Sequence, residues 1–409
     1  MKKYQKFLAA ALALCSVSTV ANAASYQLND YSVTNLGRSY AGVGVVGDDY
    51  SAIAYNPAGM TLKKKSGLQQ VVNMIGVKSK VEKLDGTAEG TMKFWQPMPA
   101  GFGQYNVNDR FVVGAGIYAP FGLKTQYKSD WFGSDYAILS KLAIVDFNVS
   151  AAYKLDEHWS IGASAILRYI YGRMTQSVSA SSPLGGGDIN FNVHGYAQTG
   201  TLGLMYEFDK DSRVGVAYHL RSAQRANGNM KIHTAAITKT GTAHANPDLP
   251  EYITFSAYHK VHQKVGLSGT VRWTHWTSSF PDFTIRNDIG GLFPAETKSY
   301  YDYQNTWAVA LGTDYYYDDN LTLRGGIGYD ESPTHKPERR TYRIPDGDRY
   351  WISAGASYVL DNWQFDAAYA YLRARTALSS ETAGIGATPT AKFKGTHSNI
   401  LGVQVQYSF

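Results

Sequence analysis

Cysteine is almost absent from this 409-residue chain. The only one, Cys15, lies in an amino-terminal stretch that has the three parts of a secretory signal, namely early lysines, an apolar core at 7–20 and the cleavage motif Ala21-Asn22-Ala23. We expect residues 1–23 to be removed as a signal peptide. Because the bulky Leu14 precedes the cysteine, no lipid anchor is expected, and the mature chain would carry neither thiol nor disulfide.

Long hydrophobic runs and a strong charge of one sign are also missing. After the leader, no apolar run approaches the roughly 18 residues of a membrane-spanning helix, and the mean hydropathy is −0.28, which excludes a helical membrane protein. Charged residues make up only 18% of the chain. Three leader lysines supply half of the net charge of +6, so charge does not indicate a nucleic-acid partner, and none is expected.

Motifs of catalysis and cofactor binding are missing as well. His259 and His262 flank a predicted turn and His275 ends a predicted strand, and none has a Ser or Asp at a spacing that would form a catalytic group. Gly185-Gly186-Gly187 is not followed by Lys-Ser/Thr and is therefore no phosphate loop. There is no metal-ligand cluster in the sequence. We expect no enzyme activity, no metal and no cofactor.

Aromatic residues and glycine are abundant instead. The chain contains 31 Tyr, 8 Trp and 40 Gly, a mixture typical of strands with aromatic girdles. Over 67–409, apolar and polar side chains alternate in stretches of about ten residues, as expected of strands with one lipid face and one aqueous face. In the last stretch, for example, Leu401 and Val403 share one face, and Gly402 and Gln404 share the other.

Fourteen such segments are predicted. They lie near 67–78, 98–107, 111–121, 142–154, 159–175, 192–207, 213–223, 251–259, 264–275, 303–316, 321–330, 349–359, 363–374 and 396–409. Short turns such as Asn108-Asp109 alternate with long loops, the pattern of periplasmic turns and extracellular loops. We predict an all-β fold, a 14-stranded antiparallel transmembrane β-barrel in the bacterial outer membrane. The alternative is a secreted β-sandwich or solenoid, against which the even strand count and the loop alternation stand.

The region before the first strand lacks this alternation. Residues 24–66 are rich in Gly, Asp, Asn and Ala, and they are too many for a simple tail. Fourteen strands enclose more space than their own side chains fill, so an internal plug is physically reasonable. We therefore divide the mature chain into an amino-terminal hatch at 24–66 and a barrel at 67–409.

Several motifs along the chain match a known family. They are Leu36-Gly37-Arg38-Ser39-Tyr40-Ala41-Gly42, Asn56-Pro57-Ala58-Gly59-Met60, Asp330-Glu331-Ser332-Pro333 and Ile344-Pro345-Asp346. With these motifs the sequence resembles the FadL/TodX family of outer-membrane long-chain fatty-acid and hydrocarbon transporters. The resemblance implies energy-independent uptake of a hydrophobic compound by a monomeric barrel with a hatch. The expected partners are a long-chain fatty acid, outer-membrane lipid and lipopolysaccharide, and the barrel-assembly machinery during biogenesis.

The resemblance also implies a ligand pocket in the lumen. Its candidate residues, which include the nearest basic side chains, are Tyr26, Leu28, Arg168, Arg173, Met174, Gln176 and Lys298. Family members often hold the carboxylate with inward basic residues, but Gln176 stands at one of those positions here. By the alternation of its strand, Arg173 points out of the barrel. Arg168 points inward, where it could contact the ligand or equally form an ion pair with Asp146 or Asp366. The choice between a fatty acid and a neutral hydrocarbon therefore stays open.

A gate in the barrel wall is the last implied feature. In the family the Asn-Pro-Ala element lies near a kink in the third strand, and the gating candidates here are Asn56, Pro57, Ala58, Gly114, Gly116 and Pro120. Proline cannot donate to a strand ladder and glycines mark bends, so a lateral exit is predicted. The alternative is an ordinary strand end at Pro120. Trp131 and Phe132 are candidates for a ligand-capture surface or for membrane-interface anchors. A general porin or an adhesin on the same barrel is the remaining alternative function.

Overall fold

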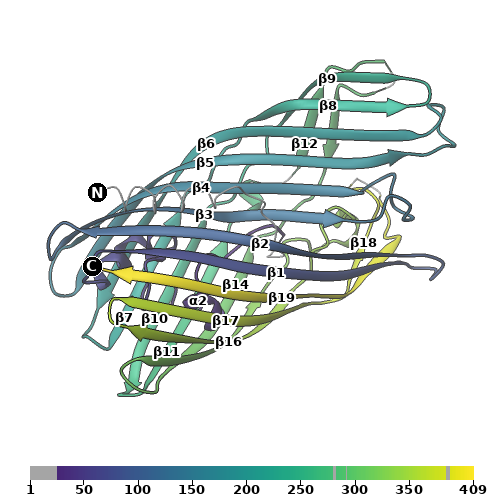
Figure 1. Cartoon of the computed structure of the whole chain (residues 1–409). Coiled ribbons are helices and arrows are strands. Elements are labelled where there is room, and N and C mark those ends of the chain that lie inside the picture. The colour runs from purple at the N-terminus through teal and green to yellow at the C-terminus, as the bar shows by residue number, and fades with distance from the viewer. Residues whose placement is uncertain (1–24, 280–281, 292, 384–386) are drawn as a thin grey trace.

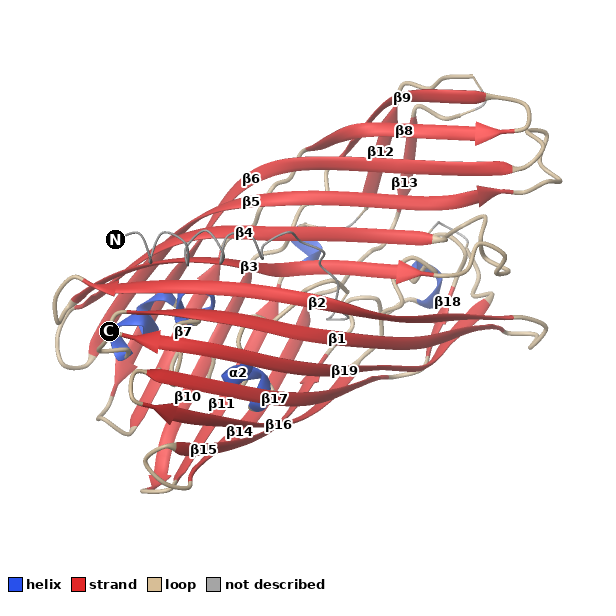
Figure 2. Cartoon of the chain, in the orientation of Figure 1, coloured by secondary structure: helices blue, strands red, loops and turns tan. Residues whose placement is uncertain are grey.

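A computed structural model describes residues 25–279, 282–291, 293–383 and 387–409. The predicted signal peptide lies outside these residues. Within them, no helix combines the length and the apolar character needed to cross a membrane. Nearly all of the regular structure is strand (Figure 2).

Fourteen strands, each antiparallel to its neighbours, close into a barrel (Figure 1). In order around the wall they are β1 (Gly67–Lys83), β2 (Glu89–Asn106), β3 (Phe111–Gln126), β4 (Leu139–Lys154), β5 (Trp159–Val178), β6 (Gly187–Glu207), β7 (Ser212–His219), β10 (Tyr252–His262), β11 (Val265–Thr274), β14 (Thr306–Tyr316), β15 (Leu321–Asp330), β16 (Arg349–Leu360), β17 (Trp363–Ala374) and β19 (Ala391–Ser408). The ring closes where β19 pairs with β1. Every predicted segment is one of these strands, so the predicted fold is confirmed.

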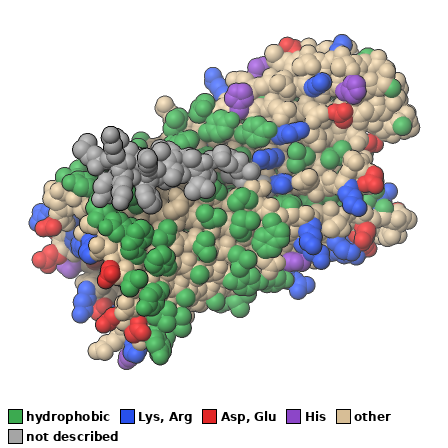
Figure 3. All heavy atoms as spheres, in the orientation of Figure 1, with side chains coloured by type: hydrophobic (Ala, Val, Ile, Leu, Met, Phe, Trp, Pro, Cys, Tyr) green, Lys and Arg blue, Asp and Glu red, His purple; other side chains and the backbone are tan. Residues whose placement is uncertain are grey.

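The outer face of the barrel is apolar. On β19, Leu401 and Val403 are 51% and 61% exposed, whereas Gly402 and Gln404 are buried. Hydrophobic side chains gather over the middle of the wall (Figure 3). A closed barrel pairs its backbone groups internally and leaves no edge, which is what a strand protein needs in order to cross lipid.

Two of the long connections carry strands of their own beyond the barrel wall. These strands are β8 (Ala226–Thr234), β9 (Thr238–Ala245), β12 (Phe283–Asn287) and β13 (Glu296–Ser299), and a short β18 (Ala377–Ser379) pairs with β19. Sequence analysis predicted these connections as long loops and did not identify the strands within them. β6 is 21 residues long and β7 only eight, so β7 pairs only with residues 201–207 of β6. β8 pairs with residues 187–195 of β6, beyond the end of β7.

The amino-terminal segment 25–66 lies inside the ring, where Figure 1 shows its helix α2 (Val33–Gly37). The Ser32 side chain caps α2 by accepting a hydrogen bond from the Asn35 backbone N–H. Two further turns follow, α3 (Ala52–Tyr55) and the 3₁₀ helix η1 (Pro57–Leu62). Two short 3₁₀ helices, η2 (Trp276–Ser278) and η3 (Pro337–Arg339), lie in loops. Most side chains of the segment are buried against the wall.

Glycines on the inner wall let this segment approach closely. A Cβ on Gly326 of β15 would lie 2.2 Å from the Arg38 carbonyl carbon, and one on Gly355 of β16 would lie 3.0 Å from the Gly37 Cα. Any larger residue at Gly326 would therefore push α2 off the wall. This close contact leaves α2 and Arg38 little room to move against β15 and β16.

Four charged residues, which we call the buried ionic cluster, tie the segment to the barrel. Arg38 Nη1 lies 2.8 Å from Asp48 Oδ2 and 2.9 Å from Asp314 Oδ1 of β14. Arg324 of β15 contacts the same two carboxylates, each at 3.0 Å. Because each arginine meets both aspartates, the two positive and two negative charges compensate one another away from water.

Candidate functional site

An apolar cavity lies between the amino-terminal segment and the wall formed by β3 to β6. It encloses about 660 Å³, part of it open to solvent. Its apolar and aromatic lining residues are Tyr26, Leu123, Leu142, Ile170, Met174, Phe191, Val193, Ala245, Pro247, Phe283, Tyr301 and Ile344. Tyr26 belongs to an aromatic cluster next to the cavity, because its ring lies 5.2 Å from that of Trp276 and 6.0 Å from that of Phe121. Such a site suits an alkyl chain or an aromatic hydrocarbon.

Of the three cations that line this apolar cavity, Lys141 and Arg173 point outward by the alternation of β4 and β5, which leaves Arg343. It comes from the loop between β15 and β16, and its Nη2 donates to Gln176 Oε1 at 2.6 Å while its Nη1 donates to Ser140 Oγ at 3.1 Å. Loss of solvation lowers the pKa of Arg343 to about 10, so it stays positively charged near neutral pH. Within the described part of the chain, no carboxylate pairs with it. A partly buried guanidinium without a carboxylate partner, beside an apolar cavity, can receive an anionic head group.

Sequence analysis missed Arg343, although it lies directly before the Ile344-Pro345-Asp346 motif. It did place other residues near the same cavity. Tyr26 and Met174 line it, and Gln176 is the hydrogen-bond partner of Arg343. Leu28 is buried in the neighbouring cluster of core residues instead.

The basic candidates named from the sequence lie elsewhere. Arg168 forms two hydrogen bonds with Asp146, at 2.6 and 2.7 Å, so its charge is already compensated. Arg173 borders the cavity, but its strand alternation directs the side chain outward, where it is exposed. Lys298 lies on β13 and pairs with Asp282 at 2.7 Å, outside the cavity lining.

The barrel wall beside the cavity is incompletely paired. β2 and β3 are in register only from Gly101↔Ile117 to Asn106↔Val112, whereas β2 pairs with β1 as far as Glu82↔Glu89. Residues 89–100 of β2 and 118–126 of β3 therefore flank a stretch without a shared ladder, which we call the β2–β3 gap. Pro97 and Pro99 lie on its β2 edge, where a residue without an N–H loses no ladder bond.

The amino-terminal segment reaches the other edge of this gap. β3 has a register shift between Tyr118 and Phe121, around Pro120. There the Leu28 N–H donates to the Pro120 carbonyl at 2.8 Å, and the Gly122 N–H donates to the Tyr26 carbonyl at 2.7 Å. The backbone that holds Tyr26 in the cavity is thus hydrogen-bonded to the strand that borders the gap.

The other predicted gating residues have different neighbours. Asn56 starts η1 by accepting from the Ala58 N–H at 3.1 Å, and its Nδ2 donates to the Leu204 carbonyl of β6. The Pro57–Ala58 backbone packs against Gly162 of β5, so this element faces β5 and β6 rather than the kink in β3. It lies there because glycines on those strands leave room for its backbone.

The two predicted glycines of β3 lie below the gap, where β3 still pairs with β2. A Cβ on Gly114 would lie 2.8 Å from side-chain atoms of both Ile53 and Met60, and one on Gly116 would lie 2.6 Å from Phe102. Both glycines make room for inward packing in the paired part of the wall.

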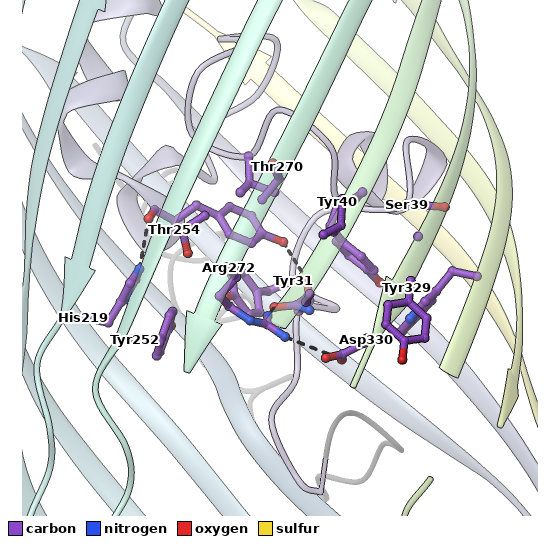
Figure 4. Close-up of a pocket in the computed structure, with 18 residues that line it drawn as sticks. Tyr31, Ser39, Tyr40, His219, Tyr252, Thr254, Thr270, Arg272, Tyr329 and Asp330 are labelled. Carbon is purple, nitrogen blue, oxygen red and sulfur yellow. Dashed lines mark hydrogen bonds and ion pairs between the residues drawn. The ribbon is translucent and has the colours of Figure 1, made fainter. Parts of the chain in front are cut away.

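A second cavity, of about 560 Å³, lies against the opposite wall (Figure 4). It is more polar, because Arg272 projects into it, bonding Asn29 Oδ1 at 2.6 Å and lying 3.5 Å from Asp330. Asp330 also pairs with Arg349 at 2.9 Å. Two arginines therefore share one carboxylate, and these charged groups make the cavity better suited to water than to an alkyl chain.

Trp131 and Phe132 do not form an exposed surface. Trp131 is only 6% exposed, stacks on Tyr127 at 3.9 Å between ring centres, and donates from Nε1 to the Ala137 carbonyl. Phe132 is partly buried against it. Both sequence-based interpretations of these rings, capture surface and interface anchor, were wrong, because the loop folds back over its own aromatic cluster.

Among the described residues, no group of His, Cys, Asp and Glu is arranged to hold a metal ion. Of the three histidines considered in the sequence, His275 contacts Glu251 at 2.6 Å, and His259 contacts Ser212 at 2.9 Å on the exposed surface.

Comparison with known proteins agrees with this geometry. A family model described as "Outer membrane protein transport protein (OMPP1/FadL/TodX)" matches residues 14–409. The long-chain fatty acid transport protein of Salmonella typhi is 29% identical over 392 residues, covering 86% of this chain and 88% of that protein. The 47 kDa outer membrane protein of Pasteurella multocida is 30% identical over 438 residues, covering 99% and 98%.

Solved structures share the fold. A FadL homologue from Pseudomonas aeruginosa has a TM-score of 0.83 at 23% identity and covers 94% of this chain and 100% of that chain. The toluene transporter TodX of Pseudomonas putida has a TM-score of 0.71 at 17% identity, with 94% and 99% covered. At these identities the likeness shows a common barrel architecture.

Proposed function

Because the chain belongs to the OMPP1/FadL/TodX family of outer-membrane transport proteins, we propose that it carries long-chain fatty acids across the bacterial outer membrane without an energy source. Transport of a hydrophobic compound is the activity common to its family. Its relatives are named as transport proteins, which supports a function other than catalysis. The finer choice, a fatty acid rather than a neutral hydrocarbon, is our own.

Arg343 is the observation that carries this choice. An alkyl chain gains about 0.8 kcal/mol for each CH₂ removed from water, which the apolar lining supplies for any hydrophobic ligand. A partly buried cation without a carboxylate partner favours a ligand that brings a negative charge. A charge-assisted hydrogen bond contributes about 1.5–3 kcal/mol, so Arg343 is the feature that would separate a fatty acid from toluene.

We infer a route from the contacts of the amino-terminal segment. The ligand enters the cavity from the extracellular end and displaces Tyr26 from its aromatic neighbours. The residues of the hatch that move are those around 25–28, since the buried ionic cluster and the close contact of α2 with Gly326 hold the rest. Loss of the hydrogen bonds to Pro120 and Gly122 then frees the β2–β3 gap as a lateral exit. Leaving into the bilayer avoids returning the alkyl chain to water.

The proposed ligand is tested by replacing Arg343. In cells that lack their own transporter, we expect Arg343→Gln to lower uptake of radiolabelled oleate by about tenfold or more. Toluene uptake should be unchanged, because toluene has no carboxylate that could contact Arg343. Arg343→Lys should keep part of the oleate uptake. Lys298→Gln is the matched control, since it removes an equal charge outside the cavity and should leave oleate uptake unaltered.

Two outcomes would contradict the fatty-acid proposal. Undiminished oleate uptake by the Arg343→Gln variant would mean that the carboxylate is not recognised in this cavity. Uptake of toluene but not of oleate by the unaltered chain would favour a neutral hydrocarbon as ligand, the second candidate, for which the apolar lining is equally suited.

A further inference from the structure

Three cations lie side by side on the outer face of the barrel near its long-loop end. Lys124 of β3 pairs in register with Lys141 of β4, and Lys141 pairs with Arg173 of β5. By strand alternation they point outward, because the neighbours of Lys124 (Leu123 and Thr125) are buried, Ser140 beside Lys141 contacts Arg343, and Met174 beside Arg173 lines the apolar cavity. The bases of Lys141 and Arg173 border the same cavity. Like charges directly opposite one another destabilise a sheet unless an anion compensates them.

A second set of basic side chains lies on the other side of the β2–β3 gap. Four residues pair in register there across four adjacent strands: Arg373 of β17, His397 of β19, Lys78 of β1 and Lys93 of β2. Lys78 and Arg373 are exposed on the outer face, as is Lys93. The outer wall therefore carries a second set of adjacent basic side chains.

The two sets meet at the gap. The Lys124 Nζ lies 4.7 Å from the centre of the Phe94 ring, and Phe94 is the neighbour of Lys93 in β2. Lys93 and Lys124 thus flank the gap at the same level. We call Lys78, Lys93, Lys124, Lys141, Arg173 and Arg373 the cationic row. Lys and Arg side chains gather at this end of the hydrophobic band in Figure 3.

No carboxylate pairs with any member of the row in the described structure, although other cations close by are paired. Nearer the loop that joins β1 and β2, Lys80 lies 3.2 Å from Glu89. Glu82 pairs with Lys392 at 3.6 Å and contacts Lys394 as well. The chain therefore supplies acidic partners immediately above the row and leaves the row itself uncompensated.

The row lies at the boundary of the membrane-facing surface. Two residues further into the barrel on the same strands, the outward side chains are aromatic. These are Trp95 below Lys93, Tyr171 below Arg173 and Tyr371 below Arg373. Aromatic girdles mark the interface between hydrocarbon and head groups. The row directly above such a girdle, at the long-loop end, is level with the head groups of the outer leaflet.

We propose that the cationic row binds the phosphate groups of lipopolysaccharide in the outer leaflet. The lipid A part of this lipid places phosphates directly above its acyl chains, which would lie against the apolar wall. Arginine and lysine are suited to these groups, since the guanidinium fork matches phosphate oxygens and ammonium groups act as point charges. Because Lys93 and Lys124 stand on opposite sides of the gap, one docked head group would bridge its outer end.

Purified full-length protein in a non-ionic detergent tests the proposal when it is titrated with bisphosphorylated lipid A and the bound lipid is counted by native mass spectrometry. We expect the Lys124→Gln, Lys141→Gln, Arg173→Gln triple variant to bind lipid A at least about tenfold more weakly than the unaltered protein. Lys128→Gln, Lys231→Gln, Lys239→Gln is the matched control, which removes three exposed charges outside the row and should bind normally. A gel shift on heating verifies that each variant is folded.

Further arms identify the recognised group. Lipid A without phosphates should bind at least about tenfold more weakly than the bisphosphorylated form. Equal binding of both forms, or equal binding by the triple variant and the control, would overturn the proposal. So would displacement of lipid A by an equal amount of phosphatidylglycerol, which would indicate a general anionic surface, or by inorganic phosphate, which would indicate a site for free anions.

Discussion

Bridging the β2–β3 gap covalently is expected to reduce oleate uptake to the level of cells without the protein, while oleate binding to the purified barrel persists. The predicted leader holds the sequence's only cysteine, so thiols can be introduced singly. Pro99→Cys and Ala119→Cys lie on opposite edges of the gap, just above the last register pair, Gly101↔Ile117. A short bifunctional maleimide would join them. Uptake is measured with radiolabelled oleate before and after the cross-link, and binding is measured by equilibrium dialysis.

The control places the same bridge where the wall is already continuous. Tyr105 and Val113 are register partners in the paired part of β2 and β3, so Tyr105→Cys with Val113→Cys adds a cross-link without closing an opening. Uptake should survive it. If the gap cross-link forms quantitatively and oleate still enters, the ligand passes down the lumen to the periplasm and lateral exit is wrong. In that case the more polar second cavity, beside Arg272, becomes the route to examine.

The barrel itself could be predicted from sequence because its determinants are local. Alternation along one strand records which side chains face lipid, and this holds whichever strand lies beside it. Leu401 and Val403 are exposed for this reason, and Gln404 faces inward. The turns follow from equally local chemistry, as at Asn108, whose side chain accepts hydrogen bonds from the Arg110 and Phe111 N–H groups.

The features on which the proposed function rests depend on which segments meet, and a single strand does not contain that information. Arg343 lies 167 positions from Gln176 in sequence, yet the two are hydrogen-bonded. Nothing around Arg343 distinguishes it from the paired arginines of the chain. Arg168 points into the lumen from β5, which made it a candidate for ligand binding. Asp146 lies directly opposite on β4 and neutralises its charge.

The β2–β3 gap could be predicted from the sequence only in part. The kink at Pro120 could be inferred because proline lacks an N–H. Pro97 and Pro99 carried the same signal for the opposite edge, but they fall where the alternation of β2 is weak, and β2 in fact begins at Glu89. The partner of the Pro120 carbonyl, the Leu28 N–H, lies 92 positions away, so only the fold shows that the hatch is attached to this edge.

Removing one carboxylate from the buried ionic cluster is expected to loosen the hatch without opening the barrel. Asp314 is 1% exposed and Arg38 is not exposed at all. Asp314→Ala would leave two arginines facing only Asp48, and breaking a buried pair in this way costs about 3–5 kcal/mol. The barrel keeps its fourteen-strand ladder, so the loss should appear as release of 25–66 from the wall rather than as unfolding.

Protease cleavage within 25–66 and permeability to small sugars in a liposome-swelling assay measure that release. Both should rise in Asp314→Ala, because the segment blocks the lumen when it is held in place. Asp302→Ala is the control, since its partner Lys336 is half exposed and such a pair contributes about 0.2–1 kcal/mol. Tight liposomes with Asp314→Ala would mean that close packing against Gly326 holds the hatch without the charges. Permeability with normal oleate uptake would separate the two proposed roles of the segment: the backbone contacts of residues 26–28 with β3 would still support uptake after the anchor at the buried ionic cluster is lost.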